Sequence, residues 1–119
     1  MNKMSVNFRR SEFACKCGCG FNTVDSELLR ALENIRNYFD KPVHILSACR
    51  CERHNEYVNG ARLSQHKRGR AADIIVDGVE PDDVADFAEV LMRSGGVGRY
   101  STFTHIDTRT NKAVTRWRS

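Results

Sequence analysis

The order in which helical and strand-like apolar patterns follow one another along the chain indicates its fold class. Apolar residues recur at helical spacing over 25–39, where Asp25 is placed to cap the first turn, and again after Pro81. Short apolar segments predict strands at 43–47, 71–76, 97–100, 103–108 and 113–117. Because these segments do not alternate as regular βαβ units, we expect an α+β fold in which helices flank an antiparallel or mixed sheet.

Turn-forming residues indicate where the remaining elements end. A short helix is expected over 51–59, followed by a polar, basic loop over 61–70. The helix that opens at Pro81 is expected to end at the Gly95–Gly96 pair. Proline suits the first turn of a helix, and glycine suits the position after its last turn.

The length of 119 residues and an ordinary composition indicate one folded domain. Hydrophobic residues make up 40% of the chain and charged residues 29%, so disorder is not expected. We expect residues 1–119 to form a single domain, with a Cys/Gly-rich loop at 11–22. No apolar run approaches the roughly 20 residues that a transmembrane helix needs, so membrane insertion is not expected.

The net charge of +4 is small and spread along the chain. It favours weak attraction to anionic partners such as cell-wall polymers, although solubility alone explains it equally well. Because no long basic tail is present, we expect no nucleic-acid partner, and we expect a monomer. Residues 1–10 contain no apolar segment of the signal-peptide type, which predicts synthesis in the cytoplasm.

Two of the four histidines stand where a metal site could form. His66 precedes the expected strand 71–76, Asp73 lies early in that strand, and His105 lies in the expected strand 103–108. Two imidazoles and a carboxylate, with one position left open, form a ligand set suited to catalytic zinc. If the two strands pair, the three side chains could meet around one ion. Their spacing alone also fits a surface histidine, a salt-bridged aspartate and a hydrogen-bonded core histidine.

The other two histidines are not assigned to the metal. His44 alternates with Val43 and Ile45 along the first expected strand, so it points to the opposite face. His54 lies in the short helix close to Arg50. Packing of that helix explains His54 at least as well as a place in a cleft does.

Three segments resemble the motifs of a known enzyme family. Residues 64–73, SQHKRGRAAD, resemble the S-x-H-x-x-G-x-A-x-D motif of the zinc D-alanyl-D-alanine carboxypeptidases. Residues 103–107, FTHID, resemble the second metal motif of the same family. Residues 47–51, SACRC, with His54 and Asn55 after them, resemble the family's S-G-Y-R segment and the H-N that follows it. The resemblance runs from about residue 13 to residue 109.

This resemblance implies a fold shared with LAS-type murein peptidases and the hedgehog signalling domain. It implies a zinc metallopeptidase of the D-alanyl-D-alanine carboxypeptidase type that hydrolyses peptidoglycan stem peptides, with His66, Asp73 and His105 as the zinc ligands. Arg50 matches the family arginine that binds the substrate's carboxylate, and a guanidinium suits that task because it grips a carboxylate through two hydrogen bonds. Ser64 is also assigned to substrate binding. For Arg50, a structural salt bridge is the simpler alternative.

The sequence departs from the family at the general base. Some relatives carry an acidic residue three positions before the last ligand histidine, or a second histidine two positions before it. Those positions hold Thr102 and Phe103 here. Asp107 is the best local candidate for the base, because it shares a strand face with His105. It could equally be a partner that orients a ligand histidine.

The five cysteines fall into two clusters, and their state remains open at this point. Cys15, Cys17 and Cys19 lie in the Cys/Gly-rich loop, and Cys49 and Cys51 flank Arg50. A structural zinc site with Cys49 or Cys51, a disulfide between the clusters and free thiols all fit the pattern. A link between the clusters would stiffen the loop that carries Arg50.

The resemblance leaves several functions open. The bond cut could be the terminal D-alanine bond or one within the stem or cross-bridge. Cytoplasmic synthesis suits a phage or prophage lysin that is released through a membrane hole, or an enzyme carried on a virion. A catalytically inactive, zinc-containing wall-binding module is the main alternative. A small zinc-stabilised nucleic-acid-binding protein is a second, weaker alternative.

Overall fold

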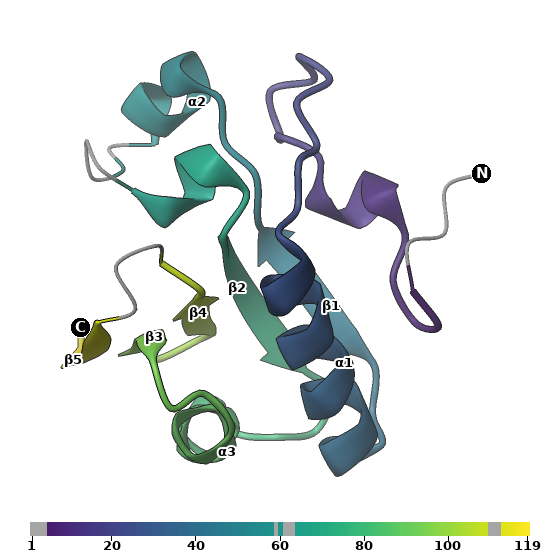
Figure 1. The fold of residues 1–119 in the computed structure, drawn as a ribbon, viewed down its shortest axis with the longest axis vertical. Helices are drawn as coiled ribbons and strands as arrows, with labels where there is room; N and C mark the ends of the chain where they lie inside the picture. Colours follow the sequence, from purple (N-terminus) through teal and green to yellow (C-terminus); the bar gives the residue numbers. More distant parts are fainter. Residues whose placement is uncertain (1–4, 59, 61–63, 110–112) are drawn as a thin grey trace.

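The computed structural model describes residues 5–58, 60, 64–109 and 113–119 (Figure 1). The chain forms three α-helices, five strands and two short 3-10 helices within these ranges. In order they are η1 (Arg10–Phe13), α1 (Ser26–Phe39), β1 (Val43–Ser47), α2 (Glu52–Tyr57), η2 (Gln65–Arg68), β2 (Ala71–Val76), α3 (Pro81–Leu91), β3 (Gly95–Arg99), β4 (Thr104–Asp107) and β5 (Val114–Arg118). The fold is α+β, as the sequence predicts.

The five strands form one mixed sheet in the order β1-β2-β4-β3-β5. Every neighbouring pair is antiparallel except β3 and β5, which run parallel. The pairing of β2 with β4 places Asp73 directly opposite His105. The strand pairing on which the predicted metal site depends is therefore confirmed.

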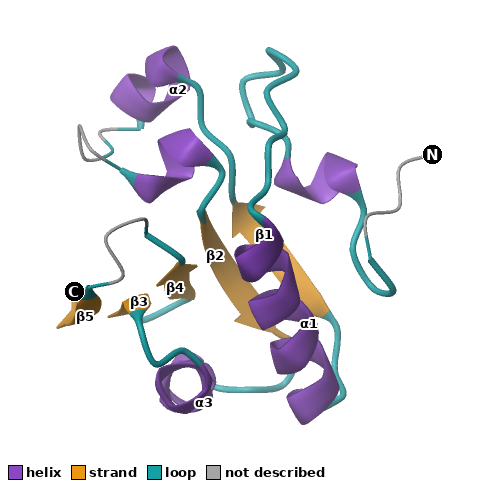
Figure 2. Cartoon of the chain, viewed as in Figure 1, coloured by secondary structure: helices purple, strands orange, loops and turns teal. Residues whose placement is uncertain are grey.

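The two longer helices cover one face of the sheet (Figure 2). Helix α1 lies along β1 and β2, and α3 lies beside β3 and β4 (Figure 1). Asp25 caps α1 by accepting a hydrogen bond from the Leu28 backbone at 3.2 Å. The buried side of α1 carries Leu28, Ala31, Leu32 and Ile35. Alternation along β2 turns Ala72, Ile74 and Val76 toward the core and leaves Asp73 on the opposite face.

The Gly95–Gly96 pair belongs to a strand, so the prediction that it ends a helix is wrong. Helix α3 ends at Leu91, and Met92 already has extended backbone angles. The glycines open β3, where the backbone passes closely against Asp107. A side chain at Gly95 would meet the carbonyl of Asp107, and one at Gly96 would meet its carboxylate.

Two further boundaries differ from the prediction. Helix α2 spans Glu52–Tyr57 and is shorter than the predicted 51–59, of which residue 59 lies outside the described part. The predicted loop 61–70 contains the 3-10 helix η2, and its residues 61–63 are likewise not described. Among the described helices, none has the length and apolar character needed to cross a bilayer.

Candidate metal centre

Strands β2 and β4 supply two side chains of the site. Asp73 and His105 face each other across the two strands, and both are buried. Asp73 Oδ1 lies 2.9 Å from His105 Nδ1. Two rigid, hydrogen-bonded strands therefore set the separation of this carboxylate and this imidazole.

The third side chain, His66, comes from η2 and points down onto β2. The Ser64 hydroxyl caps η2 by accepting from the His66 backbone N–H at 3.2 Å. Gly69 ends η2 in a left-handed conformation (φ 68°), and any side chain there would clash with the backbone of Thr23. The His66 Nδ1 donates to the carbonyl of Ala48 at 2.6 Å, which leaves Nε2 as the ligand nitrogen. That nitrogen lies 3.3 Å from Asp73 Oδ1.

The separations of these three groups fit a zinc ion. Their ligand atoms all lie within 4.8 Å of one another. Tetrahedral bonds of about 2.0–2.1 Å place neighbouring ligand atoms roughly 3.3 Å apart. The distances from Asp73 Oδ1 to His105 and to His66, 2.9 and 3.3 Å, are close to that value. Two imidazoles and one carboxylate also leave the fourth position of a tetrahedral site for water or substrate.

The three candidate ligands line a cavity of about 590 Å³. Arg50, Ser64 and Trp117 contribute to its wall. The His105 ring lies 5.0 Å from the Trp117 ring and 5.2 Å from that of His66, measured between centroids. A peptide entering this cavity could therefore reach the open side of the candidate metal site.

Asp107 orients His105 from the side away from Asp73. This fully buried carboxylate accepts from His105 Nε2 at 2.8 Å, which leaves Nδ1 to face Asp73. It also accepts from the Gly96 backbone and, through both oxygens at 2.8 and 2.7 Å, from the Arg109 guanidinium. A carboxylate has about four lone-pair positions, and these contacts use them. Of the two roles considered for Asp107, the geometry favours orientation of a ligand histidine.

Charge at the site is arranged to hold a cation. Burial raises the pKa of Asp73, but hydrogen bonds from His105 and His66 outweigh burial and keep its pKa well below the usual range. Burial lowers the pKa of His105, and the adjoining carboxylates of Asp107 and Asp73 outweigh it and raise that pKa. The carboxylates therefore stay ionised and attract positive charge between them. A metal ion that binds His105 Nδ1 must displace a proton, so metal binding there weakens as the pH falls.

Arg50 lies beside the candidate ligands. Its Nη2 is 3.5 Å from Asp73 Oδ2, and its backbone N–H donates to the His66 carbonyl at 2.9 Å. Ser47 and Asn55 accept from two other guanidinium nitrogens, at 3.2 and 3.3 Å. The salt bridge considered from the sequence is thus present. The same contacts hold the guanidinium at the wall of the cavity, where it could also meet a substrate.

Four groups near the centre were not identified from the sequence. They are the Ala48 carbonyl, Asn55, Arg109 and Trp117. Period-two alternation could have pointed to Arg109, because it follows Asp107 by two residues. Trp117 carries no such signal. It approaches His105 only because β5 pairs with β3, against which a side chain at Gly98 would clash with the Trp117 ring.

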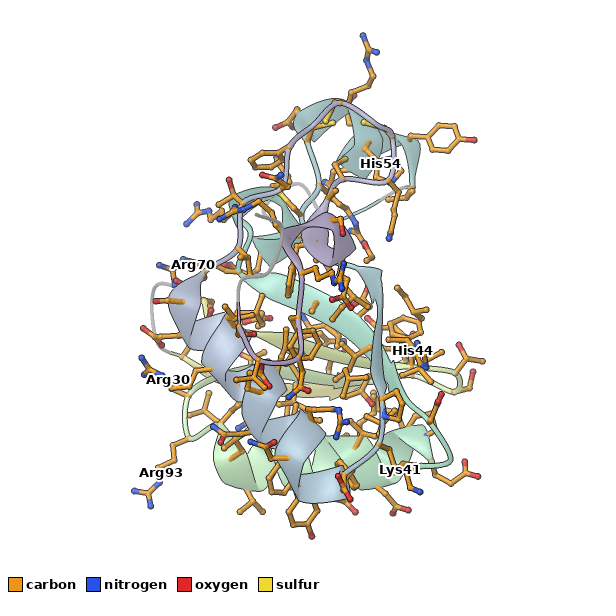
Figure 3. All side chains as sticks on the ribbon, turned by 90° about the vertical axis from the view of Figure 1, so that its right-hand side faces the viewer. Arg30, Lys41, His44, His54, Arg70 and Arg93 are labelled. Carbon is orange, nitrogen blue, oxygen red and sulfur yellow. The ribbon has the colours of Figure 1, made fainter. Side chains whose placement is uncertain are left out.

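The remaining histidines lie away from the centre, as expected. Figure 3 shows His44 on the side of the sheet opposite α1, where its Nε2 contacts Asp77 at 2.7 Å. His54 lies at α2, and its ring stacks near that of Tyr57 with centroids 6.3 Å apart. Neither belongs to a group of candidate metal ligands in the described part of the chain.

The cysteines divide differently from their order in the sequence. Cys15, Cys17, Cys19 and Cys51 form a second group whose sulfur atoms lie within 4.8 Å of one another. Cys49 is buried apart from this group, and burial raises the pKa of its thiol to about 11.

Comparison with known proteins gives one family. A family model described as peptidase M15 matches residues 6–107 of this chain. The matched range contains Arg50 and all three candidate metal ligands. Arg109 and Trp117 lie beyond it. No curated protein matches the chain.

Proposed function

The chain belongs to the peptidase M15 family of zinc-dependent metallopeptidases, and from this we propose that it hydrolyses peptides of bacterial peptidoglycan. In this proposal His66, Asp73 and His105 hold one catalytic zinc ion. The observation that carries it is the convergence of these three groups at one cavity, beside a positively charged Arg50. A bound zinc ion supplies Lewis acidity, which polarises a carbonyl and makes water more acidic.

The residues around the cavity have separate tasks in this proposal. Asp107 and the Ala48 carbonyl hold the two imidazoles in the orientation that presents one nitrogen of each to the metal. Arg50 binds the carboxylate of the stem peptide, and Ser64 contacts the peptide from the cavity wall. The reaction is a D,D-carboxypeptidase or endopeptidase cleavage. A free terminal carboxylate next to the scissile bond would engage Arg50 in the first case.

Metal content and turnover measured together test the proposal. We expect the purified chain to contain zinc and to release D-alanine or a larger fragment from purified peptidoglycan or stem peptides. A chelator should abolish the release, and added zinc should restore it. Mass spectrometry of the products identifies the bond that is cut. A chain that contains no zinc after purification in zinc-containing medium would contradict the proposal.

Replacement of Asp107 separates its two proposed roles. We expect Asp107→Asn to weaken zinc affinity by about 10–100-fold, because it weakens the hold on His105 and on Arg109. At saturating zinc, kcat should recover most of its value and keep the pH profile of the unchanged chain. If Asp107 is the general base, kcat at saturating zinc should instead fall by about 10²–10⁴-fold and its acid limb should disappear. Asp77→Asn, at an exposed pair with His44, is the matched control.

A wall-binding module that holds zinc without cleavage is the second candidate. One observation favours it: of the two carboxylates that line the cavity among the described residues, Asp73 is a candidate ligand and Asp107 is engaged by Arg109 and His105. Zinc-dependent co-sedimentation with peptidoglycan, without any product in the turnover assay, would identify this function.

We also propose that the chain acts as a monomer on the wall after release from the cytoplasm, as a phage lysin does, or as part of a virion. The net charge of +4 supports attraction to anionic wall polymers. Lysis that requires a co-expressed membrane-permeabilising protein would agree with release from the cytoplasm.

A further inference from the structure

A compact group of thiols lies outside the candidate catalytic centre. The Sγ atoms of Cys15 and Cys17 are 3.5 Å apart, those of Cys15 and Cys51 3.8 Å, and those of Cys17 and Cys51 3.6 Å. Cys19 belongs to the same group, in which all four sulfur atoms lie within 4.8 Å. Three of these cysteines come from the loop after η1, and the fourth begins α2.

The spacing of the sulfur atoms is that of ligands around one ion. Zn–S bonds of about 2.3 Å in a tetrahedron place the sulfur atoms roughly 3.8 Å apart. The three measured separations fall between 3.5 and 3.8 Å, and no pair is markedly closer than the others. A disulfide needs one pair of sulfur atoms about 2.05 Å apart and leaves the other two to pair separately. Near-equal spacing of three thiols therefore favours a shared ion over a disulfide.

The local backbone explains how cysteines in a C-x-C-x-C segment can converge. Gly18 and Gly20 have φ angles of 83° and 92°, which side-chain-bearing residues rarely adopt, so the loop reverses direction at both. The Cys15 backbone N–H donates to the carbonyl of Phe21 at 2.7 Å and closes the loop. Without these reversals, extended backbone would separate residues 15 and 19 by roughly 13 Å.

Backbone hydrogen bonds to the sulfur atoms support the same assignment. The Cys51 N–H donates to Cys15 Sγ, and the His54 N–H donates to Cys51 Sγ, both at 3.4 Å. Such bonds orient ligating sulfur atoms and offset part of the negative charge that four thiolates bring. Cys49 faces the core two residues before Cys51 and takes no part.

We propose that Cys15, Cys17, Cys19 and Cys51 form a closed, structural four-thiolate zinc site, separate from the centre at His66, Asp73 and His105. The site joins the loop after η1 to the segment between β1 and α2, which run side by side in Figure 1. Arg50 precedes Cys51, and its backbone N–H is bonded to His66. The second ion thus fixes the wall of the cavity that carries Arg50, and it has no open position for substrate.

Zinc counting on matched variants tests this site without reference to turnover. The chain purified under reducing conditions should contain two zinc ions, and Cys17→Ser should contain one. Cys49→Ser is the control and should keep two. His66→Ala should also contain one, and the double variant Cys17→Ser/His66→Ala none. In the cobalt-substituted protein, the intense near-ultraviolet thiolate-to-cobalt band should vanish in Cys17→Ser and persist in His66→Ala.

Two further readouts bear on the state of the thiols. Lys16 is exposed between two of the proposed ligands, so trypsin should cleave after it faster in Cys17→Ser than in Cys49→Ser. After chelation under denaturing, non-reducing conditions, an alkylating reagent should label all five cysteines. Fewer labelled thiols would show a disulfide and overturn the proposal. A single zinc ion in the reduced wild-type chain that His66→Ala removes would overturn it too, while leaving the catalytic proposal intact.

Discussion

Replacing His66 with alanine should remove the zinc ion of the catalytic centre and reduce peptidase activity to background. His66 is buried, supplies one of three ligands, and is held toward Asp73 by its bond to the Ala48 carbonyl. Two remaining ligands bind zinc far more weakly than three, and the substitution also leaves a space for water beside Asp73. The helices should be unaffected, because His66 lies outside α1 and α3.

The measurement combines zinc content, turnover of peptidoglycan and far-ultraviolet circular dichroism. In a Cys17→Ser background any zinc that remains belongs to the catalytic centre, so the loss can be read as one ion to none. His44→Ala is the matched control, since His44 is exposed and pairs with Asp77 outside the centre. Retention of zinc and turnover in His66→Ala would refute the assignment of this ligand.

Replacing Arg50 with alanine should lower kcat/KM on substrates that end in a free carboxylate by on the order of a hundredfold or more. Removal of one partner of a buried, hydrogen-bonded charge pair costs about 2–5 kcal/mol. The same peptide with an amidated terminus should lose much less, because it presents no carboxylate to the guanidinium. Arg50→Lys should fall between, since an ammonium keeps the charge without the two-pronged geometry.

The contact of Arg50 with Asp73 provides the competing explanation, and zinc affinity distinguishes the two. If Arg50 acts only by holding Asp73, then Arg50→Ala should weaken zinc binding and affect both substrates equally. Arg30→Ala, which removes an exposed arginine from α1, is the control for net charge (Figure 3). An equal loss on the free and amidated peptides at saturating zinc would argue against carboxylate recognition and favour an endopeptidase.

The sequence predicted the elements whose signal is local. The spacing of apolar residues and the cap at Asp25 located α1, and short β-branched segments located the strands that carry Asp73 and His105. The metal ligands could be identified because their residue types and motif spacing are written in two short segments. Even their convergence needed one further condition, the pairing of β2 with β4, which the structure confirms.

Other features depend on residues that are far apart in the sequence. The Gly95–Gly96 pair looks like a helix end, but β3 requires it because Asp107 lies against that backbone. The choice of Cys51 over Cys49 follows from the direction in which each side chain leaves an extended segment, one toward the loop cysteines and one toward the core.

The sequence by itself thus determined the fold class, most of the elements and the identity of the candidate metal ligands, because these follow from local periodicity and from the chemistry of short motifs. The tertiary structure alone decided what surrounds those ligands. Arg109 saturates Asp107, and Trp117 borders His105, because strands distant in the chain pair in the sheet. Long-range pairing buries each of these groups against partners that no local pattern specifies, and burial fixes which oxygen or nitrogen atom remains free to act.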